Sequence, residues 1–399
     1  MIETMSTHKL AFGATPSTPH FTALPPLALY IHIPWCLKKC PYCDFNSHEK
    51  RQALPEARYV EALLADLETA LPSIWGRRFS SIFFGGGTPS LFSPAGIDAI
   101  LAGVRARMPV PPGIEVTLEA NPGTFEAQKF AEFNSAGINR LSIGIQSFNP
   151  GHLRALGRVH DDGEAHRAVE IGLTSIGNIN LDLMYALPEQ SIAEAEADLR
   201  TALSYQPPHL SAYHLTLEPN TLFARHPPNL PDEDSAAEMQ DAIEAILGDA
   251  GYSHYETSAH AQPGRACRHN RNYWEFGDYL GIGAGAHSKL SLPNRIFRQV
   301  RYKQPQQYLD MVEAGTPVIE EHDVARSDVG FEFMLNALRL NDGVPVALFQ
   351  ERTGFPLTLV EAGLQRAELK GLLLRDHQRI APTALGRRFL NDLQQVFLA

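Results

Sequence analysis

The sequence is poor in cysteine and in positive charge, and its first residues contain no long apolar run. Four of the 399 residues are cysteine; Cys36, Cys40 and Cys43 lie close together, and the fourth is Cys267. Thiols so few and so clustered exclude the disulfide framework of a small secreted domain. They indicate a metal or cofactor site instead.

The charge balance disfavours nucleic acid as a partner. The formal net charge is -11, from 34 Lys and Arg against 45 Asp and Glu. Proteins that bind nucleic acid neutralise its phosphates with basic surfaces. We therefore expect small-molecule chemistry.

The first 26 residues hold Ser, Thr, His and Pro, with neither the pattern of a signal peptide nor a membrane-spanning run. We expect a flexible arm over residues 1–26 and a cytoplasmic protein, with transient membrane association left open. Met5 leaves it undecided whether the first four residues belong to the native start.

From Leu27 to about His260, apolar strand-like runs alternate with amphipathic helical stretches, as in βα units on a parallel sheet. Helix starts are marked by Ser93 before Pro94 and by a capping box at Ser191 and Glu194. The strand runs are residues 27–33, 79–84, 114–120, 140–146, 178–186 and 209–217. Six units fit the α/β class, as a partial (β/α)6 barrel, better than a complete eightfold one.

The βα rhythm stops near residue 320. We expect a barrel domain over residues 27–320 and a small, mainly helical, winged-helix-like domain over residues 321–399. The second domain lacks a strong basic excess, so it is interpreted as a cap or docking module.

Strand parity predicts a polar face inside the sheet, because successive side chains of a strand point to opposite faces. Polar residues recur at every second position, at Glu115, Thr117 and Glu119, at Ser142, Gly144 and Gln146, and at Asn180 and Asp182. In a barrel this face belongs to a ligand-holding lumen. Satisfied polar groups in the core are the alternative.

The three clustered cysteines follow the first strand with C-x3-C-x2-C spacing. Barrel proteins place active sites at such strand ends. Three thiolates can hold three irons of a cubane and leave the fourth iron open to a ligand. A zinc site, or a closed cluster with Cys267 as fourth ligand, is the alternative.

These residues resemble the radical S-adenosylmethionine superfamily. Tyr42 provides the aromatic before the last cysteine, and residues 85–89, GGGTP, resemble the glycine-rich motif of that superfamily. A tight turn is the alternative explanation of the glycines. The resemblance implies a [4Fe-4S] cluster on Cys36, Cys40 and Cys43, bound S-adenosylmethionine and an electron donor. Its shared chemistry is reductive cleavage of the cofactor to a 5′-deoxyadenosyl radical.

Within the superfamily, the chain is similar to the oxygen-independent coproporphyrinogen III oxidases and the related HemW-type haem chaperones. The similarity rests on YIHIPWC, GGGTPS, LEANPGT, NRLSIGIQSF, GRVH, LDLMYALP and LGIGAGAHS. It implies contacts to S-adenosylmethionine from Tyr30, Tyr42, Gly86, Gly87, Thr88, Glu119, Gln146, Arg158 and Asp182, and also from Thr216 and His287.

Two departures favour the chaperone side. The oxidases carry a further cysteine two residues after the third, where this chain has Phe45, and they have a longer segment before the first strand. His269-Asn-Arg-Asn-Tyr-Trp274 also matches a chaperone pattern. It implies a haem site with His269 or Cys267 as iron ligand, Arg271 for a propionate, and Tyr273 and Trp274 against the macrocycle. A hydrogen-bonded histidine among core aromatics is the alternative.

Three functions remain open. The first is a carrier that binds haem and delivers it to an acceptor protein. The second is an oxidase that decarboxylates coproporphyrinogen III to protoporphyrinogen IX, which Phe45 disfavours. The third is a radical enzyme with another substrate.

Overall fold

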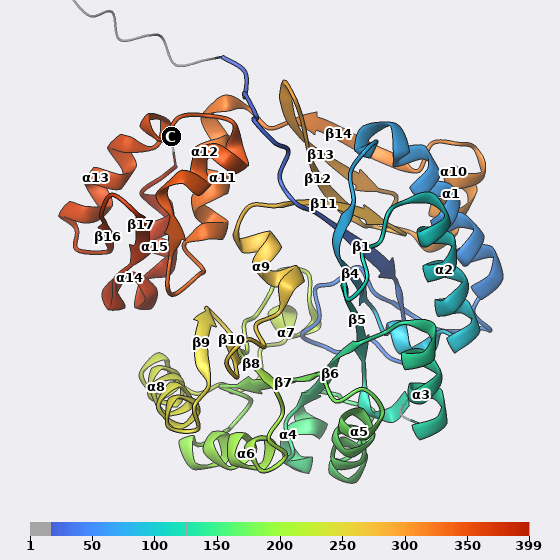
Figure 1. Cartoon of the computed structure of the whole chain (residues 1–399). Coiled ribbons are helices and arrows are strands. Elements are labelled where there is room, and N and C mark those ends of the chain that lie inside the picture. The colour runs from blue at the N-terminus through green and yellow to red at the C-terminus, as the bar shows by residue number, and fades with distance from the viewer. Residues whose placement is uncertain (1–16, 125, 399) are drawn as a thin grey trace, which may run out of the picture.

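The computed structural model describes residues 17–124 and 126–398. Its centre is a curved sheet of twelve strands with helices on its outer side (Figure 1). Six parallel strands follow the predicted runs: β1 (Leu27–Ile33), β4 (Phe79–Gly86), β5 (Glu115–Ala120), β6 (Arg140–Gln146), β7 (Ile179–Tyr185) and β8 (His209–His214). The predicted α/β class and partial barrel are confirmed.

Helices return the chain between the strands, and their starts have local causes. The Ser93 hydroxyl accepts from Gly96 N and caps α2 (Pro94–Arg107), and Ser191 forms a capping box with Glu194 at the start of α6 (Ile192–Ser204). The other helices around the sheet are α1 (Glu56–Ile74), α3 (Ala127–Ala136), α4 (Pro150–Ala155), α5 (Asp162–Ser175), α7 (Leu222–Arg225), α8 (Glu233–Asp249) and α10 (Pro305–Glu313). Their apolar faces and one face of the strands form the main core.

The sheet continues beyond the six predicted strands at both edges. Its order is β14-β13-β12-β11-β1-β4-β5-β6-β7-β8-β10-β9, so the described strands leave it open rather than closed into a barrel. β11 (Asp278–Ile282) lies parallel to β1, and the other additions are antiparallel. These are β12 (His287–Leu292), β13 (Arg295–Arg301), β14 (Val318–Asp323), β9 (Ser253–Glu256) and β10 (Ala259–Ala261).

The C-terminal region is mainly helical around a small sheet, as a winged-helix-like fold requires. Its sheet has the order β15-β17-β16, from Val344–Pro345, Arg379–Pro382 and Leu373–Arg375. Its helices are α11 (Arg326–Ala337), α12 (Val346–Thr353), α13 (Glu361–Leu369), α14 (Ala384–Arg388) and α15 (Leu390–Gln395). A second core forms here, and Phe276 and Ile296 of the large sheet region join it.

The segment before β1 contacts both the large sheet and the C-terminal region. His20 N donates to Gly354 O at 2.8 Å, and Phe21 packs against the C-terminal core. Asp278 N donates to Pro26 O at 2.8 Å on the side of the large sheet. Residues 1–16 of the predicted arm lie outside the described residues. Among those described, no helix is long and apolar enough to cross a membrane.

Candidate cluster and cofactor site

The cysteine loop begins where β1 ends. Trp35–Cys36 (β2) pairs in parallel with His48–Glu49 (β3), which closes the loop between them. Inside the loop, Cys43 N donates to Cys40 O at 3.2 Å, and Lys39 Nζ donates to Phe45 O at 3.1 Å. All three loop cysteines are free thiols of intermediate exposure, and all three line one cavity.

The environment of these three thiols favours the binding of a metal cluster, which would stabilise their thiolate form. Burial raises the pKa of Cys36 and of Cys43, although hydrogen bonds from Thr88 and Ser47 oppose part of the rise. The Arg158 guanidinium lies 3.6 Å from Cys40 Sγ. Three thiols in one loop, facing one cavity beside a cation, fit a cluster with three protein ligands.

The first cavity, of about 590 Å³, extends along the parallel strands, from Arg140 and His209 at strand starts to Gly86 and Gln146 at strand carboxyl ends. Its walls include Glu119, Gln146 and Asp182, together with Ser142 and Asn180. These residues belong to the polar strand face predicted from parity, so the prediction of a polar lumen is confirmed.

Two half-buried carboxyl groups, Glu119 and Asp182, give this cavity its electrostatic character. Burial, and secondly the charge of Asp182, raise the pKa of Glu119 to about 8, although Gly86 N donates to Glu119 Oε2 at 3.1 Å. Burial likewise raises the pKa of Asp182, while hydrogen bonds from Ser142 and Asn180 oppose the rise. Such carboxyl groups can accept from hydroxyl groups, and they ionise when a cation enters.

The glycine motif packs directly beneath the cysteine loop. Gly86 has φ +116, and a Cβ there would lie 2.5 Å from His32 Cε1. A Cβ at Gly87 would lie 2.5 Å from Trp35 O, and Thr88 N donates to Trp35 O at 2.8 Å. Gly86 therefore needs glycine because of its positive φ and the adjacent His32 ring, and Gly87 needs it because the backbone of Trp35 approaches closely. Gly86, Gly87 and Thr88 also line the first cavity. The same residues can therefore form a tight turn and part of a ligand-binding surface.

Nine of the predicted S-adenosylmethionine residues line the first cavity: Tyr42, Gly86, Gly87, Thr88, Glu119, Gln146, Arg158, Asp182 and Thr216. The other two, Tyr30 and His287, line a second cavity of about 640 Å³. Phe45, Phe83, Gly86 and Glu119 border both cavities, which therefore adjoin. The second cavity lies among β1, β4, α9 (Arg268–Trp274), the strands β11–β13 and Asn336 of α11.

The predicted haem residues divide between two environments. Cys267 and His269 are buried at the start of α9, whereas Tyr273 and Trp274 at its end line the second cavity. Arg271 is exposed, donates to Glu275 at 2.8 Å and does not border the second cavity.

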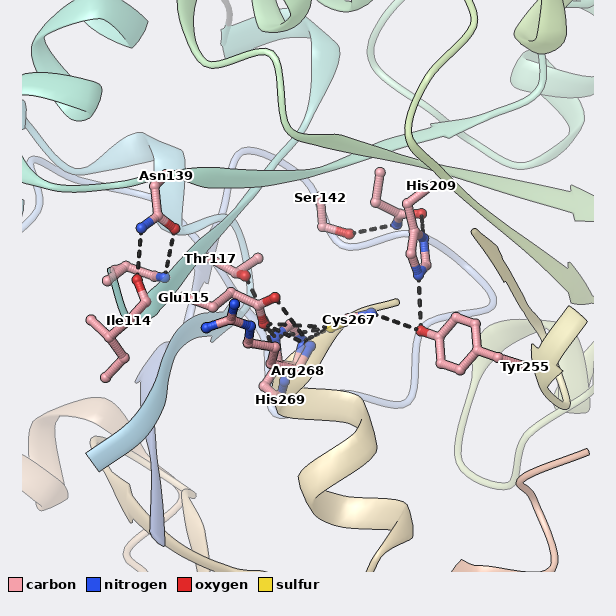
Figure 2. A network of polar contacts seen from close by, with 12 residues as sticks. Ile114, Glu115, Thr117, Asn139, Ser142, His209, Tyr255, Cys267, Arg268 and His269 are labelled. Carbon is pink, nitrogen blue, oxygen red and sulfur yellow. Dashed lines mark hydrogen bonds and ion pairs between the residues drawn. The ribbon is translucent and has the colours of Figure 1, made fainter. Parts of the chain in front are cut away.

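Figure 2 shows the polar contacts that join Cys267 and His269 to Glu115. The Glu115 carboxylate accepts from Arg268 N at 3.0 Å and from both His269 N at 3.1 Å and His269 Nδ1 at 3.0 Å, so it caps α9. Burial would raise the pKa of Glu115, but the hydrogen bond and charge of His269 outweigh it and lower the pKa to about 2.

The ligand atoms of Glu115, Cys267 and His269 lie within 4.8 Å of one another, a geometry that a metal ion could use. The buried Arg140 guanidinium adds a positive charge next to them and, with Cys267 and Glu115 as partners, has a raised pKa. That cation, together with the N–H groups already on Glu115, favours a helix cap over a metal centre. Sequence reasoning missed Arg140, although a charged residue opening an apolar strand was visible.

Comparison with known proteins covers nearly the whole chain. The family model described as Radical SAM superfamily matches residues 30–202, and the HemN C-terminal domain model matches residues 324–389. "Heme chaperone HemW" of Escherichia coli is 46% identical over 379 residues, which cover 94% of this chain and 99% of the relative. "Heme chaperone HemW" of Haemophilus influenzae is 46% identical over 381 residues, 94% of this chain and 98% of the relative.

Among solved structures, the coproporphyrinogen III oxidase HemN from Escherichia coli superposes with a TM-score of 0.80. The match covers 94% of this chain and 91% of the oxidase, at 23% identity. At that identity the likeness shows a common fold and leaves the reaction open.

Proposed function

Since this chain belongs to the HemW family of the radical S-adenosylmethionine superfamily, we propose that it binds haem and delivers it to an acceptor protein. The observation that carries the proposal is the alignment of 94% of the chain, at 46% identity, with two relatives named as heme chaperones. Phe45, where the oxidases resembled by the sequence carry a cysteine, supports the same choice.

The chaperone would carry a [4Fe-4S] cluster and S-adenosylmethionine in the first cavity. Cys36, Cys40 and Cys43 would hold the cluster, and the walls from Gly86 to Asp182 would hold the cofactor. When bound, this pair supplies one-electron reduction of a sulfonium, for which an electron donor is required. The residues of the chain would orient the cofactor, and Glu119 would hold or release a proton as charge enters the cavity.

Haem would bind beside α9. Tyr273 and Trp274 line the second cavity, and aromatic rings of this kind pack on a flat apolar macrocycle. Arg339 lies over the Trp274 ring, with Cζ 4.2 Å from the centroid, and fixes the indole.

The remaining assignments belong to the same proposal. The chain would work in the cytoplasm, with haem, an acceptor protein and an electron donor as partners and without nucleic acid. The barrel domain would span residues 27–320 and the C-terminal domain residues 321–399, with the latter as cap or docking module.

The test uses the protein with its cluster reconstituted without oxygen. One sample receives haem, and another receives coproporphyrinogen III with S-adenosylmethionine; the Soret band and the tetrapyrrole products are followed. We expect stoichiometric haem binding and no decarboxylation. Formation of protoporphyrinogen IX would make the protein an oxidase instead, and failure to bind haem would exclude the carrier function.

A further inference from the structure

The second cavity has the walls that a metalloporphyrin requires. Its aromatic side chains include Phe45 in the cysteine loop, Tyr273 and Trp274 in α9, and Tyr279 in β11, together with Tyr30 of β1, Phe83 of β4 and Phe276. Tyr273 and Tyr279 meet edge to face, with ring centroids 5.0 Å apart. Phe45 is 60% exposed, so its ring is accessible to a ligand in this cavity.

Basic side chains also line this cavity, among them Arg298 and Lys303. The Arg298 guanidinium is fixed by Glu332 at 2.8 Å and by the Tyr279 hydroxyl at 3.1 Å. Lys303 is exposed, and its ammonium has no ion-pair partner among residues 17–124 and 126–398. An unpaired ammonium beside an aromatic wall suits the carboxylate of an otherwise apolar ligand.

Three histidines near these walls differ in their freedom. His32 borders the second cavity, but both of its ring nitrogens are hydrogen-bonded, to the Tyr30 hydroxyl at 2.8 Å and to Asn46 O at 2.9 Å. His269, which borders the first cavity, stacks on Phe83 with centroids 4.2 Å apart, donates from Nδ1 to the Glu115 carboxylate at 3.0 Å, and has Cys267 Sγ 3.4 Å from Nε2. A macrocycle placed on either nitrogen would overlap these neighbours, because a porphyrin extends several ångströms around its iron in every direction of its plane.

The imidazole of His287, in contrast, is not held by such contacts. It opens β12, is exposed, borders the second cavity and has no hydrogen-bond partner for its imidazole within the described part of the chain. Partial burial, and then the charges of Lys303 and Arg298, lower its pKa. The imidazole is therefore neutral near pH 7, the form that ligates iron.

We propose that the second cavity is the haem site and that His287, rather than His269, ligates the iron. This inference rests on the proposed function and deepens it. Haem in this position lies against Phe83, Gly86 and Glu119, which also border the first cavity. The role of the α9 motif is then to present Tyr273 and Trp274, with His269 anchoring the helix through Glu115.

The experiment compares three variants of the cluster-loaded protein in anaerobic titrations with ferric haem. His287→Ala removes the proposed ligand, His269→Gln removes the buried imidazole, and His322→Ala is the matched control, an exposed histidine of β14 outside the cavity. Affinity is read from the Soret band and iron ligation from electron paramagnetic resonance. Circular dichroism and iron content show that each variant is folded and loaded.

We expect His287→Ala to lose the imidazole signature and at least tenfold in affinity, and added free imidazole to restore the signature. His322→Ala should match the wild type, and folded His269→Gln should retain its ligation signature. Wild-type ligation in His287→Ala, or its loss in folded His269→Gln alone, would overturn the assignment while leaving the carrier function intact. Absence of haem binding by the wild type would overturn both.

Discussion

At the scale of single residues, Glu119 has the most unusual environment of the first cavity. It is enclosed between two cavities, with one backbone donor at Gly86 N and a second carboxyl group, Asp182, nearby. With a pKa raised to about 8, Glu119 is mostly protonated at pH 7 before a ligand enters. Entry of the cationic S-adenosylmethionine favours the ionised form.

We therefore expect the affinity for S-adenosylmethionine to rise with pH below about 8, by at most about tenfold per pH unit, and to level off above it. Calorimetry in buffers of different ionisation enthalpy should detect proton release at pH 7. Glu119→Gln cannot ionise, so it should bind more weakly and remove this pH dependence. If the affinity of Glu119→Gln for S-adenosylmethionine depends on pH as strongly as that of the wild type, a group other than Glu119 titrates.

The cysteines permit a matched comparison. Cys36→Ala should abolish the iron–sulfur charge-transfer absorbance and S-adenosylmethionine cleavage, because a cubane cannot be held by two protein thiolates. Cys267→Ala removes the thiol outside the loop, buried at the start of α9, and should retain iron and sulfide contents near the wild type. Cluster loss in Cys267→Ala, with Cys36→Ala still loaded, would contradict the three-ligand assignment.

At the scale of elements, the cap on α9 is a long-range contact, because Glu115 and Arg268 come from β5 and from the helix more than a hundred residues later. Glu115→Ala leaves buried N–H groups without an acceptor and should lower the free energy of unfolding by roughly 1–3 kcal/mol. Urea unfolding followed by circular dichroism measures the loss. Glu115→Gln keeps an acceptor oxygen and should lose less.

Glu132→Ala, at an exposed position of α3, is the control and should change the free energy of unfolding by less than about 0.5 kcal/mol. Equal losses in Glu115→Ala and Glu132→Ala would show that the α9 cap contributes nothing.

The sequence predicts the elements well where pattern and packing agree. The six parallel strands repeat apolar positions that helices cover, and their parity placed Glu119 and Asp182 on one face. It does not predict β14, whose Glu320, Glu321 and His322 are exposed at the edge of the sheet. Edge strands carry charge and lose the apolar pattern by which strands are recognised. β11 pairs with β1 across most of the chain, a neighbour relation that no local pattern contains.

At the scale of the whole molecule, the second cavity shows what the sequence could not predict. Its walls come from the cysteine loop, α9, the strands β11–β13 and α11, which meet only through the register of the large sheet and the docking of the C-terminal region. The sequence therefore indicated Tyr273 and Trp274 as haem residues without bringing them next to Lys303.

The segment before β1 joins the two regions, since Phe21 packs on the C-terminal core while Pro26 O accepts from Asp278 N. Phe21→Ala should lower the stability of the C-terminal region by about 1–2 kcal/mol, less than for a fully buried phenylalanine. Hydrogen exchange of the amides in α12 should speed up accordingly. Phe45→Ala changes an exposed ring and should leave the exchange of the α12 amides unaltered. If both variants speed up this exchange equally, Phe21 does not specifically stabilise the C-terminal region.

If both cavities hold ligands, the wall that the cavities share, which includes Glu119, would couple the two binding equilibria. A ligand that ionises Glu119 from one side changes the potential on the other, and by reciprocity each ligand alters the affinity for its neighbour by the same factor. Delivery of cargo could thus be timed by the cofactor without any large movement of the fold. Whichever sign this cooperativity has, it would make release of haem conditional on what occupies the neighbouring cavity.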